Sequence, residues 1–180
     1  MKHAPSVIFA GVFSLAITIF ILLYVGIQPA VIIGGSAIIA FFVWLSTTYH
    51  RPVSPGKIVP MYLLALTGQI IHTGEEYIAD FPGHLSGLFH LHNFDRNTFA
   101  LAVLIFAVAV WVLTAYGLLK RSALANYFLW FFLIGPGIVN GIAHIAFPVI
   151  MRQLYFPGLV TVIIPTILSI VIIRKILARA

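Results

Sequence analysis

The stretch SVIFAGVFSLAITIFILLYVG, residues 6–26, is an uninterrupted apolar run about as long as a helix that crosses a bilayer. Similar runs recur along the 180-residue chain, which is 62% hydrophobic, only 8% charged and has a mean hydropathy of +1.11. A water-soluble domain does not repeat such runs, because its helices alternate apolar and polar faces. The sequence therefore predicts one all-α polytopic membrane domain over residues 1–180.

The expected helices are separated by short connections that are polar or contain proline and glycine, residues that end helices. We expect about six transmembrane spans, at roughly residues 6–26, 29–47, 59–79, 97–119, 126–147 and 157–177. We expect residues 80–96 to form a loop and Asn97 or Thr98 to cap the fourth span. Pro136, in the sequence GPG, is expected to kink the fifth.

The basic residues predict the orientation of the bundle. With a cytoplasmic N-terminus, eight of the ten Lys and Arg residues lie inside: Lys2, Arg51, Lys57, Lys120, Arg121, Arg174, Lys175 and Arg179. Arg96 and Arg152 then lie outside. Because cytoplasmic loops are enriched in positive charge, we expect both termini to be cytoplasmic. The basic residues form no continuous face, which excludes nucleic acid as a partner, and the absence of cysteine excludes thiol chemistry.

Titratable residues gather in the third predicted span and the loop after it. All four acidic residues and four of the seven histidines lie between residues 70 and 97. Residues three and four apart share a helix face, so His72, Glu75 and Glu76 are expected on one side of the span. In the fifth span Asn140 and His144 are also four apart. We expect the two helices to pack together and bring these side chains to one site.

Burial of two carboxylates in a bilayer requires compensation. Even on the lenient insertion scale, one such group costs ~2.5–3.5 kcal/mol at the bilayer centre. Neither span contains Lys or Arg, whereas imidazole and carboxylate groups are ligands of zinc, iron or manganese. We therefore expect one divalent metal ion, zinc or iron, with the ligands His72, Glu75, Glu76 and His144, and with His90 and His92 as weaker candidates. The expected catalytic residues are Glu76, Glu75, His72 and Asn140.

Simpler roles remain open for several of these residues. Glu76 lies about one turn from the predicted end of its helix, where a carboxylate reaches interfacial water. Asn140 and His144 are also compatible with interhelical hydrogen bonds that only hold the bundle together.

Three short motifs add a family resemblance. HTGEE at 72–76, NGIAH at 140–144 and YFPGLVT at 155–161 resemble, in this order, the motifs of the HxxEE family of small bacterial membrane proteins. The resemblance covers roughly residues 60–170. The family is defined by its motif and has no assigned function. Membership implies a multi-pass protein of the bacterial inner membrane in which His72, Glu75, Glu76, Asn140 and His144 work together.

These observations favour a membrane-embedded, metal-dependent enzyme that acts on a lipid or another hydrophobic molecule as a hydrolase or an oxidoreductase. The metal would activate water or oxygen, and the second glutamate would act as acid or base. One alternative is a metal-free acid/base isomerase, because His72 and Glu76 resemble the pair of emopamil-binding-type sterol isomerases. A proton or metal-ion transporter and an accessory subunit are further alternatives. The expected partners are the bilayer and a hydrophobic small molecule or lipid, and a second copy of the chain in a homodimer is a further candidate.

Overall fold

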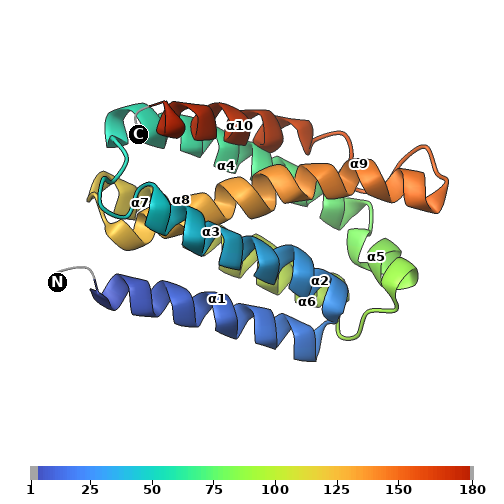
Figure 1. Cartoon of the computed structure of the whole chain (residues 1–180). Helices are drawn as coiled ribbons and strands as arrows, with labels where there is room; N and C mark the ends of the chain where they lie inside the picture. The colour runs from blue at the N-terminus through green and yellow to red at the C-terminus, as the bar shows by residue number, and fades with distance from the viewer. Residues whose placement is uncertain (1–3, 179–180) are drawn as a thin grey trace.

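The protein is a bundle of long helices, seen in a computed structural model that describes residues 4–178 (Figure 1). The described residues contain no β-strand. The elements are α1 (Ala4–Tyr24), α2 (Ile27–Pro29), η1 (Ala30–Gly34), α3 (Gly35–Ser46), α4 (Pro55–Ile78), α5 (Phe81–Phe89), α6 (Arg96–Phe99), η2 (Ala100–Ala107), α7 (Val108–Leu119), α8 (Ala123–Phe132), η3 (Leu133–Val139), α9 (Asn140–Met151) and α10 (Ile163–Leu177). The η elements are π-helical stretches, so α2–η1–α3, α6–η2–α7 and α8–η3–α9 are each one continuous helix. The predicted all-α class is confirmed.

Within the described chain, four helices have the length and apolar composition to cross a membrane. They are Ala4–Tyr24, Ile27–Ser46, Arg96–Leu119 and Ala123–Met151. Helix α4 has 24 residues but a polar second half, and α10 has 15 residues, fewer than the ~20 of a typical span. The start of α1 and the end of α10 lie at the same end of the bundle, as six passes require (Figure 1). Six spans and cytoplasmic termini stay predictions.

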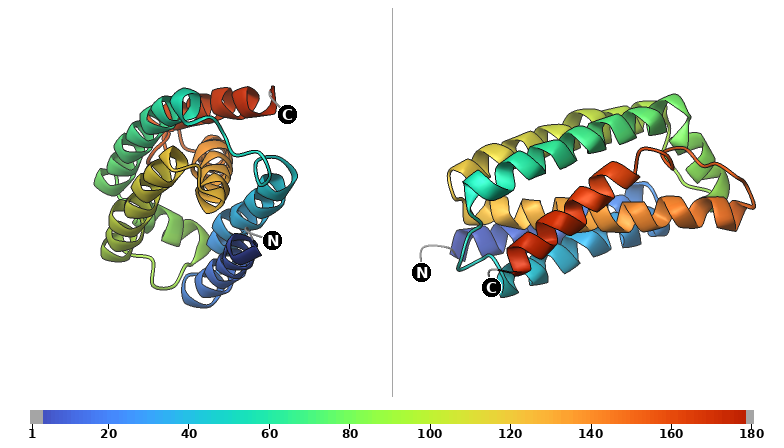
Figure 2. Two further views of the ribbon diagram at one scale, coloured as in Figure 1. Left: turned by 90° about the vertical axis from the view of Figure 1, so that its left-hand side faces the viewer. Right: turned by 90° about the horizontal axis from the view of Figure 1, so that it is seen from above.

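The helix α8–η3–α9 lies in the middle of the bundle, and the other long helices surround it (Figure 2). Its α8 portion supplies some of the largest buried side chains, including Tyr127, Trp130 and Phe132. The outward faces remain apolar: Leu23 and Ile78 are each 80% exposed. An apolar exterior of this extent is what a lipid environment requires, because water would disfavour it.

Glycines allow α10 to lie against both α4 and the central helix. A Cβ atom on Gly68 of α4 would lie 2.7 Å from Ile164 Cγ2, and one on Gly141 of α9 would overlap the Thr166 hydroxyl. Small residues permit this close approach of helices in membranes. The position of α10 in turn places the preceding connection, residues 152–162, beside the polar second half of α4.

Two segments differ from their predicted structure at the end of the bundle that carries this connection. Residues expected to be a loop form α5, where Pro82 is tolerated in the first turn and Phe81 and Leu85 are buried. The sixth helix begins at Ile163 rather than at residue 157, because Gly158 has φ +92°, a conformation that interrupts a helix.

The cap of the fourth predicted span also differs. Asp95, not Asn97 or Thr98, caps α6: its Oδ1 accepts a hydrogen bond of 2.7 Å from the Thr98 amide. Pro136 lies inside η3, and the helix continues through it to Met151, so the kink stays a prediction.

Candidate metal centre

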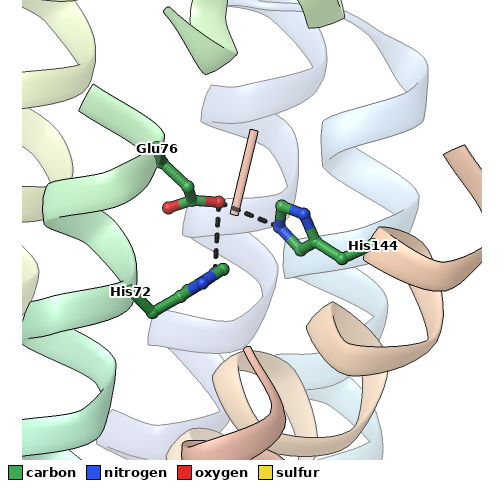
Figure 3. Close-up of side chains that lie close together, drawn as sticks. All are labelled: His72, Glu76 and His144. Carbon is green, nitrogen blue, oxygen red and sulfur yellow. Dashed lines mark hydrogen bonds and ion pairs between the residues drawn. The ribbon is translucent and has the colours of Figure 1, made fainter. Parts of the chain in front are cut away.

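Three buried side chains from two helices form a compact group of potential metal ligands. His72 and Glu76 come from α4 and His144 from α9, with exposed fractions of 0%, 4% and 0%. One Glu76 oxygen, Oε1, lies 3.0 Å from His144 Nε2 and 3.3 Å from His72 Nε2 (Figure 3). All three ligand atoms lie within 4.8 Å of one another. The expected meeting of the third and fifth predicted spans is therefore confirmed at these residues.

The hydrogen bonds of His72 determine where its proton lies. Its Nδ1 is 3.2 Å from Thr161 Oγ1, and the Thr161 hydroxyl donates its own hydrogen to Glu75 Oε2 at 2.6 Å. The hydroxyl oxygen must then accept from His72, so the proton lies on Nδ1. His72 Nε2 is left with a lone pair, which accepts from Asn140 Nδ2 at 2.8 Å.

This assignment places two electron-rich atoms face to face. His72 Nε2 and Glu76 Oε1 are 3.3 Å apart, and neither has a hydrogen to give the other when His72 is neutral. Two such acceptors repel each other in a buried site of low dielectric. A proton or a cation between them removes the repulsion, so the site is built to hold one or the other.

The distances suit a metal ion. Bonds of about 2.0–2.1 Å in tetrahedral geometry place neighbouring ligand atoms roughly 3.3–3.4 Å apart. The two separations from Glu76 Oε1, 3.0 and 3.3 Å, are close to this value. The Glu75–Thr161–His72 chain also resembles the outer hydrogen bonds that orient metal-bound histidines. His144 is the exception, because its Nδ1 finds no hydrogen-bond partner within residues 4–178.

Glu75 faces a different side of α4 from Glu76 and binds the connection between α9 and α10. Its Oε1 accepts from the Tyr155 hydroxyl at 2.7 Å and the Gly158 amide at 3.2 Å. Its Oε2 accepts from the Thr161 amide at 3.0 Å and from the Thr161 hydroxyl. Burial, together with the Glu75 carboxylate, raises the pKa of Tyr155 to about 12. Four donors on one carboxylate fix this connection to α4, outside the group of ligand atoms.

Gly158 covers one side of the group formed by His72, Glu76 and His144. Its φ of +92° is a conformation that residues with a side chain rarely adopt. A Cβ atom here would lie 2.5 Å from His144 Cε1 and 2.7 Å from His72 Cε1. The backbone therefore lies directly against both imidazole rings, and glycine is required for conformation and for space.

His90 and His92 lie apart from this group. Both are exposed, beyond the end of α5, and the His92 backbone amide donates to the Val25 carbonyl after α1 at 3.0 Å. Asn140, in contrast, contacts the site directly through His72. Of the residues expected at the site, the structure thus gathers His72, Glu76, Asn140 and His144.

Sequence reasoning did not assign a role to Tyr155, Gly158 or Thr161. The available signal was the motif YFPGLVT, in which Pro157 and Gly158 precede a helix. The contacts of these three residues with Glu75 of α4 span 80 to 86 residues of sequence, and helical periodicity gives no information on contacts at that separation.

A large apolar cavity adjoins the cluster. It has a volume of about 620 Å³ and lies among α1, α5, η2 and the central helix. Most of its lining is apolar, including Phe81, Phe99 and Phe147, while Glu76 and Asn140 lie on its wall. Volumes of ~300–1,000 Å³ with few polar groups are typical of small-molecule sites.

The fold and site define a helical bundle of membrane type with a buried histidine–glutamate centre beside an apolar cavity. Residues 63–173 match the family described as "Protein of unknown function with HXXEE motif", and the chain belongs to this family. The motif corresponds to His72, Glu75 and Glu76. Neither a curated protein nor a solved structure matches the chain.

Proposed function

We propose that this protein is a membrane-embedded, metal-dependent enzyme that acts on a lipid or another hydrophobic molecule. The observation that carries the proposal is the position of Glu76. One of its oxygens is shared by two buried imidazoles, and the same side chain lies on the wall of the apolar cavity. The reactive group and the space for an apolar substrate thus meet at one residue.

Zinc or iron held by His72, Glu76 and His144 would supply Lewis-acid activation of water or oxygen. Three protein ligands are typical of catalytic zinc sites, which keep a further position for water or substrate. The residues around the three ligands hold them in a state that can bind a metal. Thr161 keeps the His72 proton on Nδ1 and so leaves Nε2 without one, while Gly158 lies against both imidazoles and Phe156 packs beside that of His144. Asn140 competes for the His72 Nε2 lone pair and must release it when a metal binds.

A metal-free acid/base isomerase is a second candidate, and the unpartnered His144 Nδ1 favours it. A histidine bound to metal usually donates its other N–H to an acceptor, and His144 faces none among the described residues. In this case the proton between His72 and Glu76 would be the reactive one, passed to and from a substrate in the cavity.

Comparative mass spectrometry of membrane lipids tests the proposal. Cells would express the wild type, Glu76→Gln, or Asp95→Asn, which neutralises an exposed carboxylate as a matched control. We expect a lipid change with the wild type and Asp95→Asn and none with Glu76→Gln. In isolated membranes a chelator should stop the change, and zinc or ferrous iron should restore it. A change that survives chelation would favour the isomerase, and equal lipids in all three strains would contradict an enzymatic function.

A further inference from the structure

The cavity beside Glu76 indicates the chemical class of its ligand. Its polar lining consists of Tyr24, Gln28, Gln69, Glu76, Thr98 and Asn140, and the remaining lining is apolar or glycine. Within residues 4–178, no Lys, Arg or His lines it. An anionic headgroup such as a carboxylate or phosphate would therefore find no cationic side chain in this lining, and only a metal held by Glu76 itself could compensate its charge.

Two polar atoms at the cluster end of the cavity are free acceptors. Glu76 Oε1 faces both imidazoles, whereas Oε2 has no hydrogen-bond partner in the described chain (Figure 3). Asn140 gives its Nδ2 to His72, which leaves its Oδ1 free. Both side chains line the cavity. A third lining acceptor, Gln69 Oε1, is buried without a hydrogen-bond partner among the described residues. A ligand that donates a hydrogen bond is therefore favoured here, because acceptors left unpaired inside a protein are costly.

The mouth of the cavity lies on the lipid-facing flank of the bundle. The most exposed of its large apolar lining residues are Phe20 of α1, by 58%, and Leu101 and Phe106 of η2, by 63% and 59%. Lining residues that are also exposed mark the opening, which therefore lies between α1 and η2. A ligand reaching the cavity through this opening comes from the apolar surroundings rather than from water.

We propose that the cavity binds a neutral, long-chain or polycyclic alcohol, whose hydroxyl donates to Glu76 Oε2 or Asn140 Oδ1 while its apolar body lies among the phenylalanines. This inference rests on the proposed function, because it assigns the substrate class of the same site. A hydroxyl supplies the required donor without charge. An ammonium group also donates, but it would have to lose its hydration in an apolar cavity.

Competition against a photoreactive alcohol tests the headgroup. The full-length protein in lipid nanodiscs would be labelled with a diazirine analogue of hexadecanol, with hexadecanol, hexadecanoate or hexadecylamine as competitors. We expect hexadecanol to compete about tenfold or more better than hexadecanoate and better than the amine, with labels on α1 and η2. Equal competition by all three, or stronger competition by the acid or the amine, would overturn the proposal.

Two alanines of the same helix provide matched variants. Both are exposed, but Ala102 lines the cavity and Ala109 does not. Ala102→Phe should lower the labelling roughly tenfold by filling the cavity, and Ala109→Phe should leave it unchanged. Equal labelling of both variants would place the ligand elsewhere and overturn the inference. Zinc binding measured on the same samples separates the two proposals: zinc binding without selectivity for the alcohol overturns the ligand class alone, whereas alcohol selectivity without zinc binding overturns the metal alone.

Discussion

Glu75 and Glu76 are adjacent in sequence but serve two different regions of the molecule. Glu76 faces the buried imidazoles and the cavity, with one oxygen still free. Glu75 lies about 100° further around the helix and accepts four hydrogen bonds from the connection before α10. A carboxylate with every lone pair engaged is suited to hold structure, whereas one with a free oxygen is suited to bind a ligand.

The two regions are joined through Thr161, which contacts both Glu75 and His72. We therefore propose that Glu75 is a positioning residue, which acts on the cluster by fixing the proton of His72. In this proposal the second glutamate of the motif, Glu76, would carry the chemistry, and the first, Glu75, holds the connection before α10 in place.

The largest difference in zinc affinity is expected when each of the two glutamates is neutralised in turn. Glu76→Gln removes a ligand atom and its charge, and we expect zinc affinity to fall by about 100-fold or more with the fold retained. Glu75→Gln keeps all three ligand side chains, and we expect it to lower zinc affinity only about tenfold. Competition with a chromophoric zinc chelator measures both. Equal losses in the two variants would contradict the division of roles.

The next effect is expected at the glycine between the two regions. Gly158→Ala places a methyl group against both imidazoles in a conformation that itself costs about 1–3 kcal/mol. We expect a lower thermal unfolding temperature together with weaker zinc binding. Gly74→Ala in α4 is the control, since a Cβ there meets nothing within 4 Å. If both variants unfold at the same temperature, Gly158 does not lie against the cluster.

Substitution of Thr161 can remove the hydrogen-bond link between His72 and Glu75. Thr161→Val keeps the shape but removes the hydroxyl between His72 and Glu75, and we expect zinc affinity to fall about tenfold. Thr161→Ser retains the hydroxyl and should bind zinc nearly as the wild type does. A loss of the same size in both variants would indicate a packing role, not a hydrogen-bond link.

A smaller effect of opposite sign is expected at Asn140. Its amide occupies the His72 lone pair that a metal needs, so Asn140→Ala should leave zinc affinity unchanged or raise it a few-fold. Zinc titration of this variant sharpens the choice between the two candidate functions, because a metal-free site has no such competition. Much weaker zinc binding in Asn140→Ala would show that Asn140 supports the metal rather than competes with it.

The smallest expected effect is on the pH dependence of stability, and it involves only the connection before α10, residues 152–162. Burial and the Glu75 carboxylate raise the pKa of Tyr155 from its ordinary value of 10.0 to about 12, so the neutral phenol is favoured in the folded state. This contribution is fully present below pH 10 and is lost as the pH rises toward about 12. Tyr155→Phe should therefore lower thermal stability slightly at neutral pH and flatten its decline between these pH values. An unchanged decline would mean that another group is responsible.

The sequence was sufficient for the long apolar helices, but not for α5 or the start of α10, and for one half of the site. Apolar runs of about 20 residues predict helices directly, and spacings of three and four place His72 beside Glu76 and Asn140 beside His144. The same spacing could not separate Glu75 from Glu76, because residues at both i+3 and i+4 count as one face. Their different directions appear only when the partners on each side of α4 are known.

The other half of the site depends on contacts that local patterns do not encode. Pro157 and Gly158 predict a helix start, but their actual role is to bring an irregular segment over the imidazoles. Thr161 meets His72 across 89 residues of sequence. Such a contact follows from the packing of α10 against α4, where Gly68 lets the two helices approach.

X-ray absorption spectroscopy of the zinc-loaded wild type tests the central claim most directly, because the spectrum reports which groups surround the metal. We expect one zinc per chain, with scattering from the two imidazoles of His72 and His144 and an oxygen ligand from Glu76. The imidazole scattering should disappear or weaken in His144→Ala. A spectrum without imidazole, or one that His144→Ala leaves unchanged, would contradict a metal centre at this site.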